Sequence, residues 1–168
     1  MKTLTLIRHA KSSWKNTELE DFDRPLNKRG KKDLPGLAIR VGQQLPKPDC
    51  LLYSPALRTR LTSEPLIVVW RLTDQQVKPL PEAYEASSST LLKLLRKTPD
   101  TCQHLVLIGH NPGLAELTSR LTGQALLHFP TAAVAHLCLT NEHWATLDDH
   151  CASLSWFDYP KKHRLEDL

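Results

Sequence analysis

Two arginines and two histidines of this 168-residue chain lie at or just beyond the ends of short apolar runs. Arg8 and His9 close the first run, Arg58 lies one helical turn beyond the second, and His110 follows the most apolar run. A guanidinium stays charged and can bind two oxygens of an anion at once. An imidazole is half-neutral near physiological pH, and its neutral nitrogen can attack phosphorus. These residue types together predict chemistry on a tetrahedral oxyanion, most naturally a phosphoryl group.

The segments that would position these residues alternate between strand and helix patterns. Ser54 should cap the second helix and Pro55 should begin it, and Pro65 should kink or interrupt it. Asn111 should cap the fourth helix, which Pro112 begins. The periodicity predicts strands at 3–7, 50–53, 77–80 and 104–108, helices at 28–45, 55–72, 90–97 and 112–121, and a final antiparallel strand pair at 134–139 and 151–157.

This alternation favours a three-layer α/β/α fold with a mostly parallel central sheet. Ligands of open α/β sheets bind beyond the carboxyl ends of the strands. If the strands that precede the arginines and histidines are neighbours, these side chains converge on one pocket beside two helix N-termini, which favour anions. We expect one domain over residues 1–160, followed by a charged tail over residues 161–168.

Composition narrows the class of protein. The chain is 40% hydrophobic and 24% charged, as in ordinary soluble domains, and no apolar run approaches the roughly 20 residues of a membrane span. The four cysteines form no C-x-x-C pair, which fits a reducing cytoplasm. The net charge of +4 permits acidic partners without arguing for them. We therefore expect a cytoplasmic protein with no membrane partner and no nucleic-acid partner.

Other chemistries find weaker support in the sequence. The remaining histidines form no H-x-H or H-E-x-x-H pattern, so no metal and no cofactor are expected. A serine hydrolase would need Ser54 or the serines at 87–89, and neither lies in a G-x-S-x-G elbow. A non-catalytic polyanion-binding module could use the basic runs at 28–32 and 161–164, but charge runs usually mark solvated faces. Turnover of an aryl phosphate would separate an enzyme from such a module.

The motifs resemble those of the histidine phosphatase superfamily, the group of branched phosphatases and phosphoglycerate mutases. The resemblance is greatest to its short SixA-like phosphohistidine phosphatases, and it runs from residue 4 to about residue 135 in family order. The matching segments are Leu6–Ala10, Asp23–Leu26 with Arg29 and Gly30, Ser54–Arg58 followed by Thr62 and Glu64, Leu80–Glu82, and Gly109–Gly113.

The resemblance implies a phosphoglycerate mutase-like fold and a role for each matching residue. His9 would be the nucleophile that becomes phosphohistidine. Arg8, Arg58 and His110 would hold the phosphoryl oxygens through the transition state, without a metal ion. Glu82, which follows the Leu-Pro pair, would be the proton donor.

Further assignments follow from the same resemblance. Glu85 is a less favoured stand-in for the proton donor. Arg24 lies in a loop motif typical of the short branch and would add positive charge to the pocket. We also assign Ser12 and Asn111 to substrate binding.

The implied activity is removal of phosphate from phosphohistidine on proteins. Little chain separates Glu82 from His110, which leaves few residues for a lid over a small substrate. An open pocket suits a phosphoryl group displayed on a protein. Small phosphate monoesters are the alternative substrates. Lys15 stands where the mutases carry an asparagine, which weakens a mutase interpretation.

Overall fold

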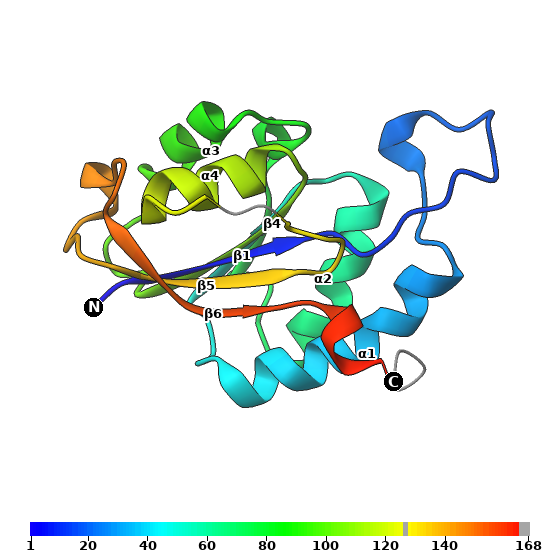
Figure 1. The fold of residues 1–168 in the computed structure, drawn as a ribbon, viewed down its shortest axis with the longest axis horizontal. Coiled ribbons are helices and arrows are strands. Elements are labelled where there is room, and N and C mark those ends of the chain that lie inside the picture. The colour runs from blue at the N-terminus through cyan, green and yellow to red at the C-terminus, as the bar shows by residue number, and fades with distance from the viewer. Residues whose placement is uncertain (126–127, 165–168) are drawn as a thin grey trace.

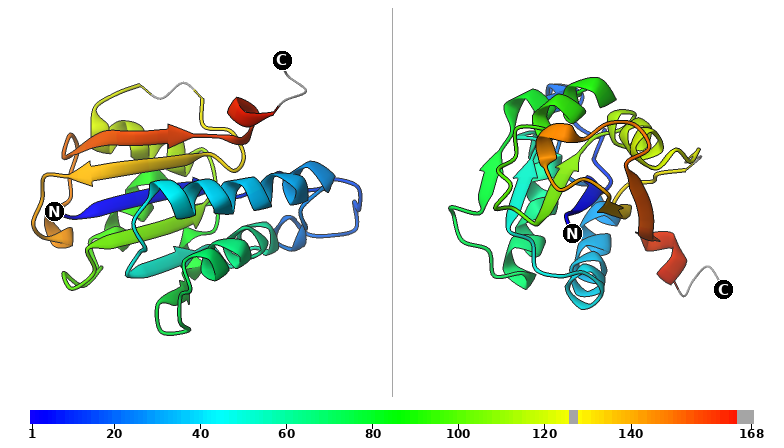
Figure 2. Two further views of the ribbon diagram at one scale, coloured as in Figure 1. Left: turned by 90° about the horizontal axis from the view of Figure 1, so that it is seen from below. Right: turned by 90° about the vertical axis from the view of Figure 1, so that its left-hand side faces the viewer.

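The computed structural model describes residues 1–125 and 128–164, in which six strands form one sheet (Figure 1). The strand order is β3-β2-β4-β1-β5-β6, and Figure 2 shows the strands side by side. The first four neighbours are parallel, whereas β5 pairs antiparallel with β1 and with β6. The strands are β1 (Thr3–Arg8), β2 (Cys50–Tyr53), β3 (Val77–Pro79), β4 (His104–Gly109), β5 (Val134–Leu139) and β6 (Ala152–Asp158).

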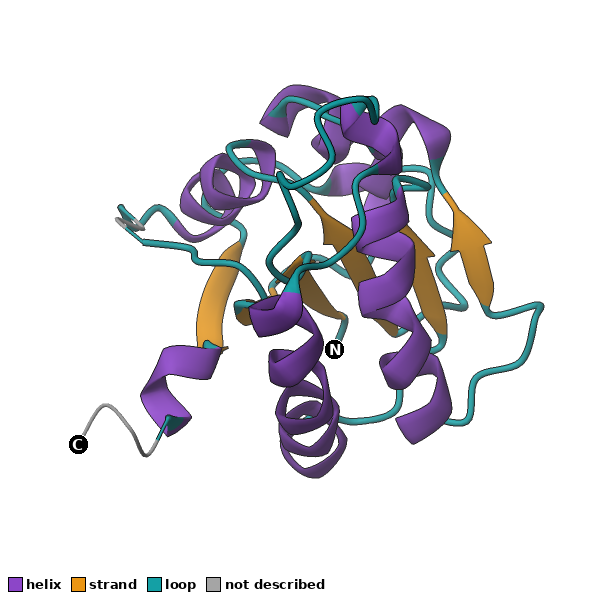
Figure 3. Ribbon diagram, turned by 90° about the vertical axis from the view of Figure 1, so that its right-hand side faces the viewer, coloured by secondary structure: helices purple, strands orange, loops and turns teal. Residues whose placement is uncertain are grey.

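Four α-helices cover the two faces of the sheet (Figure 3). Side chains of α1 and α2 pack into one core cluster, and those of α3 and α4 pack into another on the opposite face. The expected three-layer α/β/α fold is thereby confirmed. The helices are α1 (Lys28–Gln44), α2 (Leu57–Val69), α3 (Ser88–Leu95) and α4 (Gly113–Thr122), with short 3-10 helices η1 (Asp21–Asp23), η2 (Pro81–Ala83), η3 (Trp144–Thr146) and η4 (Pro160–His163).

Strand β4 shows why the central strands carry apolar residues on both faces. Leu105 and Leu107 belong to the cluster under α3 and α4, whereas Val106 and Ile108 belong to the cluster under α1 and α2. Successive side chains of a strand point to opposite faces, and helices cover both faces here. The buried sheet therefore fixes where each strand ends, and with it the position of the residues that follow.

Two of the expected helix caps are wrong. The cap of α2 is Ala56, because the Ser54 hydroxyl contacts His110 instead. The cap position of α4 is Pro112, because the Asn111 amide donates to the carbonyl of Phe129, 2.8 Å away. In both cases a tertiary partner takes the polar side chain that the sequence pattern assigned to a cap.

Two other helix expectations differ from the structure. Helix α2 runs through Pro65 without interruption to Val69, and the buried Leu66 and Trp70 pack its last turn into the core. Helix α3 begins two residues earlier than expected, because Ser87 caps it by accepting from the amide of Thr90. These changes leave the order of the elements intact.

None of the helices within residues 1–125 and 128–164 has the length and apolar character needed to cross a membrane. The division into a domain over 1–160 and a tail over 161–168 stays a prediction. Residues 165–168 of that tail lie outside the described residues.

Candidate active site

Three strand ends meet at one edge of the sheet. Strand β4 lies between β1 and β2, with Arg8 paired to Gly109 and Tyr53 paired to Ile108. The residues that follow these strands therefore share one edge, as the sequence analysis required. They line a cavity of about 360 Å³ whose walls include Arg8, His9, Arg58, Glu85 and His110.

His9 is held as a neutral side chain with one free nitrogen. It is 7% exposed, and its Nδ1 lies 2.7 Å from the carbonyl oxygen of Ala10. A carbonyl can only accept a hydrogen bond, so we assign the hydrogen to Nδ1 and the free lone pair to Nε2. Burial, and then the positive groups nearby, lower the pKa of His9 to about 3. His9 therefore has the form that a nucleophile requires.

Arg58 is the most heavily bonded cation of the site. Only 2% of its surface is exposed, although it is charged. Its Nη1 donates to the backbone oxygen of Asp21 at 2.7 Å, and its Nη2 donates to a carboxylate oxygen of Asp21 at 2.9 Å. Its Nη2 also donates to Glu85 at 3.0 Å. These contacts fix the guanidinium at the mouth of the cavity.

Asp21 was not singled out from the sequence. It lies among four acidic residues at 18–23, and nothing local distinguishes it from the others. In the fold it accepts a short hydrogen bond from the hydroxyl of Tyr84. Burial raises the pKa of Asp21, but the hydrogen bonds from Tyr84 and Arg58 prevail and lower it to about 2. The carboxylate of Asp21 therefore lies at the mouth of the cavity, beside the arginines.

Arg8 has a hydrogen-bond donor that is not used within the described residues. Its Nη1 donates to the carbonyl of Phe129 at 3.2 Å, and its buried Nε contacts no acceptor among the described residues. Burial and the neighbouring Arg58 lower the pKa of Arg8. Two guanidiniums that disfavour each other's charge would both be stabilised by an anion placed next to them.

His110 contributes a second buried imidazole. Its ring centroid lies 5.3 Å from that of His9, and its Nε2 lies 2.7 Å from the hydroxyl of Ser54. Its Nδ1 is 3.8 Å from a carboxylate oxygen of Glu85 and has no hydrogen-bond partner among the described residues. Burial and then Arg58 lower the pKa of His110 to about 4. If Ser54 donates to Nε2, the hydrogen of the neutral ring lies on Nδ1.

The structure brings Glu85 to the cavity and leaves Glu82 outside it. Glu82 is exposed on η2 and does not line the cavity. Glu85 has a φ of 53°, a left-handed conformation that costs free energy for a residue with a side chain. A Cβ on Gly113 would lie 2.2 Å from the carbonyl oxygen of Ala86, so only glycine lets this segment approach the start of α4. The expected proton donor, Glu82, therefore does not line the cavity, whereas its stand-in, Glu85, does, and the role of each stays a prediction.

The three residues assigned to substrate binding all line the cavity. Arg24 is 7% exposed, bonds to Asp21 at 3.1 Å, and lies 3.4 Å from the ring centre of Trp14. Ser12 is buried, and its backbone bridges to Leu26. Asn111 has a buried side-chain oxygen with no partner in the described part of the chain. Sequence reasoning placed these three correctly, although their roles stay predictions.

Comparisons with known proteins agree with this geometry. A solved structure from Agrobacterium tumefaciens, assigned as the phosphohistidine phosphatase SixA, superposes with a TM-score of 0.81. It is 28% identical and covers 95% of this chain and 98% of that one. A SixA structure from Nakamurella multipartitia also gives 0.81, at 25% identity, over 95% and 96% of the two chains. The chain belongs to the histidine phosphatase superfamily.

Other comparisons add little to this assignment. No family model matches. An uncharacterised protein of Mycobacterium tuberculosis is 29% identical over 167 residues, which covers 92% of this chain and 100% of that protein. The expected phosphoglycerate mutase-like fold and the SixA-like branch are confirmed for this histidine phosphatase.

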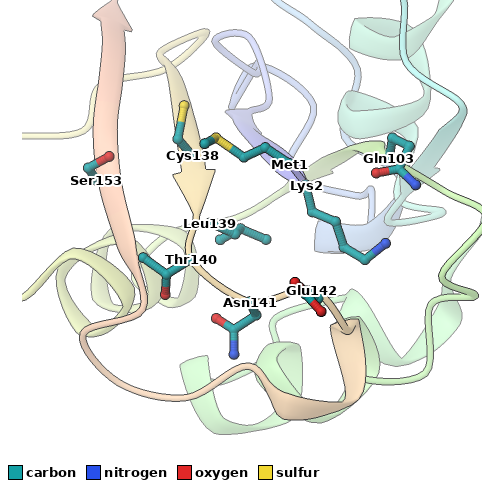
Figure 4. A pocket seen from close by; sticks show the side chains of 9 residues that line it. All are labelled: Met1, Lys2, Gln103, Cys138, Leu139, Thr140, Asn141, Glu142 and Ser153. Atoms are coloured by element: carbon teal, nitrogen blue, oxygen red, sulfur yellow. The ribbon is translucent and has the colours of Figure 1, made fainter.

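Two other features of the described part of this histidine phosphatase can be compared with the cavity. Among residues 1–125 and 128–164, no group of three or more His, Cys, Asp or Glu side chains is placed to hold a metal ion. A hollow of about 620 Å³ lies at the opposite end of β1 (Figure 4). Its lining contains no histidine or arginine in the described residues, and its Lys2 already donates to Asp100. The candidate active site is therefore the cavity at the carboxyl edge of the sheet.

Proposed function

We propose that the protein removes the phosphoryl group from phosphohistidine through a covalent intermediate on His9. The observation that carries the proposal is the state of His9. Its Nδ1 is committed to the Ala10 carbonyl, its Nε2 is free, and the Arg8 and Arg58 guanidiniums line the same cavity. The SixA structures to which the chain is similar are assigned as phosphohistidine phosphatases, which supports this substrate.

The proposed reaction has two displacements at phosphorus. In the first, the Nε2 lone pair of His9 forms a P–N bond while the P–N bond of the substrate breaks. The departing imidazole keeps the electron pair of that bond and takes a proton from Glu85, the proposed proton donor. In the second, water attacks phosphorus, the bond to His9 breaks, and inorganic phosphate is released. The protein is regenerated with a neutral His9.

The arginines supply the charge that such a transfer needs. The transferring phosphoryl group spreads negative charge over its three peripheral oxygens. Arg8 and Arg58 line the cavity with fixed positive charge, and His110 offers a further donor at Nδ1. Fixed donors of this kind stabilise a transition state without reorganisation. The proposal therefore assigns no step to a metal ion.

Glu85 replaces Glu82 as the proposed proton donor. Its carboxylate lies 3.0 Å from Arg58 and 3.8 Å from His110, inside the cavity. An alkoxide leaving group needs a proton strongly, whereas neutral imidazole leaves readily. An exposed carboxyl group such as that of Glu85 suits the second case better. Small phosphate monoesters remain the second candidate substrates, since a cavity of about 360 Å³ also admits them.

Trapping the intermediate tests the proposal. Brief reaction of the wild type with labelled phosphohistidine should leave acid-labile, base-stable phosphate on the protein. His9→Ala should carry none, and its turnover should fall by several orders of magnitude. His143→Ala, which changes an exposed histidine elsewhere, should behave as wild type. Residual turnover of His9→Ala above about one hundredth of wild type would overturn the assignment of His9 as the nucleophile.

Competition between substrates tests the substrate class. Phosphohistidine peptides, phosphoserine and phosphotyrosine peptides, and sugar phosphates would be compared by kcat/KM on one preparation. The phosphohistidine peptide should be preferred, and a preference for a sugar phosphate would favour the second candidate. The cytoplasmic location stays a prediction of the proposal, as does the absence of nucleic-acid partners.

A further inference from the structure

We infer that a basic groove beside the active site docks an acidic surface of the protein that presents the phosphohistidine. The groove has a volume of about 550 Å³. Of the described residues that line it, four are basic and none is acidic. These four residues, Lys15, Lys28, Arg29 and Lys31, define the basic groove. The inference rests on the proposed function, because it names the partner of the same site.

The groove and the phosphoryl cavity are lined by alternating residues of one chain segment. Lys11, Ser12 and Trp14 line the cavity, whereas Ser13 and Lys15 line the groove, so one stretch of backbone runs between the two. Figure 1 shows this β1–α1 segment extending beyond the carboxyl edge of the sheet. We infer that a protein whose phosphorylated side chain enters the cavity also contacts the other side of this segment, where the groove lies.

The start of α1 is fixed against the segment that follows His9. The amide of Asn27 donates to the carbonyl of Lys11 at 3.0 Å. A Cβ on Gly30 would lie 2.2 Å from that same carbonyl oxygen, so the close approach requires glycine. The lysines of α1 are therefore held in a fixed relation to the nucleophile, which a docking surface needs and a solvated charge run does not.

No acidic side chain of the described residues neutralises the lysines of the groove. Lys15, Lys28 and Lys31 are exposed and form no ion pair within the described residues. Lys28 and Lys31 also lie at the start of α1, which carries no acidic residue in its first turn. Cations at a helix N-terminus are opposed by the helix dipole. Acidic side chains of a partner would offset this repulsion between the lysines and the helix dipole.

Exposed apolar side chains of the same β1–α1 segment point to a protein partner. Trp14, Leu19 and Phe22 are three of the seven exposed large hydrophobic residues in the described part of the chain. Trp14 is 73% exposed and lies against the guanidinium of Arg24. Exposed aromatic side chains and arginine are enriched at protein interfaces. Acidic side chains around a phosphohistidine fit a surface that combines these groups with free lysines.

Three phosphohistidine peptides of equal length, flanked by glutamates, serines or lysines, would test the docking. At low salt the wild type should have a kcat/KM about tenfold higher for the glutamate peptide than for the lysine peptide. High salt should remove the difference, because exposed charges are screened. The triple variant Lys15→Glu/Lys28→Glu/Lys31→Glu should reverse the preference, while its kcat/KM for free phosphohistidine should stay within twofold of wild type.

The control is Lys78→Glu/Lys93→Glu/Lys97→Glu, which changes the net charge equally at exposed positions away from the groove. It should retain the wild-type preference. The double variant Lys15→Gln/Lys31→Gln serves if the triple variant does not fold, and it should abolish the preference without reversing it. Equal kcat/KM of the wild type for all three peptides would overturn the inference.

Two further measurements separate the possible failures. Binding of the unphosphorylated glutamate peptide, measured by isothermal titration calorimetry, reports on the groove even if no phosphohistidine is hydrolysed. Absence of hydrolysis with tight peptide binding would overturn the proposed function alone. Stronger competition by a single-stranded oligonucleotide than by the glutamate peptide would overturn the docking inference in favour of nucleic acid.

Discussion

The hydroxyl of Ser54 lies 2.7 Å from Nε2 of His110, at the point where two neighbouring parallel strands end. Ser54 is fully buried, so this hydroxyl has no access to solvent. The contact leaves Nδ1 as the ring nitrogen of His110 that faces Glu85. Ser54 is therefore a positioning residue, since it acts on the phosphoryl group only through His110.

Ser54→Ala should lower kcat about tenfold, because a buried ring nitrogen would lose its partner. The ¹⁵N shifts of the His110 ring should show loss of a single tautomer. Ser63→Ala, which removes a buried hydroxyl bonded only within α2, should leave both kcat and the ring shifts unchanged. An unchanged tautomer in Ser54→Ala would contradict the positioning role.

Arg58→Ala should reduce kcat/KM by about 10²–10³, the usual effect of losing a fixed donor to a developing anion. Arg60→Ala is the matched control, because Arg60 is exposed on the same helix two residues away. Its kcat/KM should change by less than twofold. Steady-state kinetics on phosphohistidine and on an aryl phosphate would measure kcat/KM of both variants. Equal losses of kcat/KM in the two variants would exclude a specific role for Arg58.

Glu85→Gln and Glu82→Gln form a direct test of the proton donor. Glu85→Gln should slow hydrolysis of an alkyl phosphate by about 10²–10⁴ and slow hydrolysis of phosphohistidine much less, because imidazole leaves without strong acid assistance. Glu82→Gln should match wild type on both substrates. A loss in Glu82→Gln alone would show that η2 moves into the cavity when substrate binds.

Tungstate should stabilise the wild type, since an oxyanion that binds only the folded state raises its stability. At a hundredfold excess over Kd the gain is about 2.7 kcal/mol, which corresponds to a rise in Tm of roughly 5 to 10 °C. Arg58→Ala should lose most of this rise in differential scanning calorimetry. EDTA should leave turnover unchanged, and inactivation that a divalent metal reverses would overturn the metal-free mechanism.

The fold should lose stability as the pH falls from about 6.5 toward 4. His104 and His136 are buried, and each lies within 2.8 Å of the hydroxyl of Thr5. Burial, with a smaller contribution from His136, lowers the pKa of His104 to about 4, and burial lowers that of His136. Below the unfolded pKa near 6.5, the unfolded chain binds protons that the folded chain does not, so stability falls with pH.

The midpoint of urea unfolding at pH 7.5 and pH 5.0 measures this effect. The midpoint should be lower at pH 5.0, and the difference should shrink in His104→Gln. An equal midpoint at both values would show that the two histidines accept protons without cost in the fold.

Much of the site was determined by the sequence itself. Strand and helix periods are local, so the order of the elements could be predicted to within a few residues. The Arg-His motif, Arg58 and the Gly-His-Asn-Pro segment each follow a recognisable strand, so their convergence needed only the strand order to be confirmed. The basic runs were also visible, but their location beside the cavity was not.

Only the tertiary structure decided which polar side chains become partners. The sequence gives Ser54 the features of a helix cap, yet β2 and β4 lie side by side and bring it to His110 instead. Glu82 carries the family motif, yet the left-handed turn at Glu85 sends the other carboxylate to Arg58. Asp21 has no local signature at all. A hydrogen bond between distant segments depends on sheet order and backbone direction, which a local pattern does not encode.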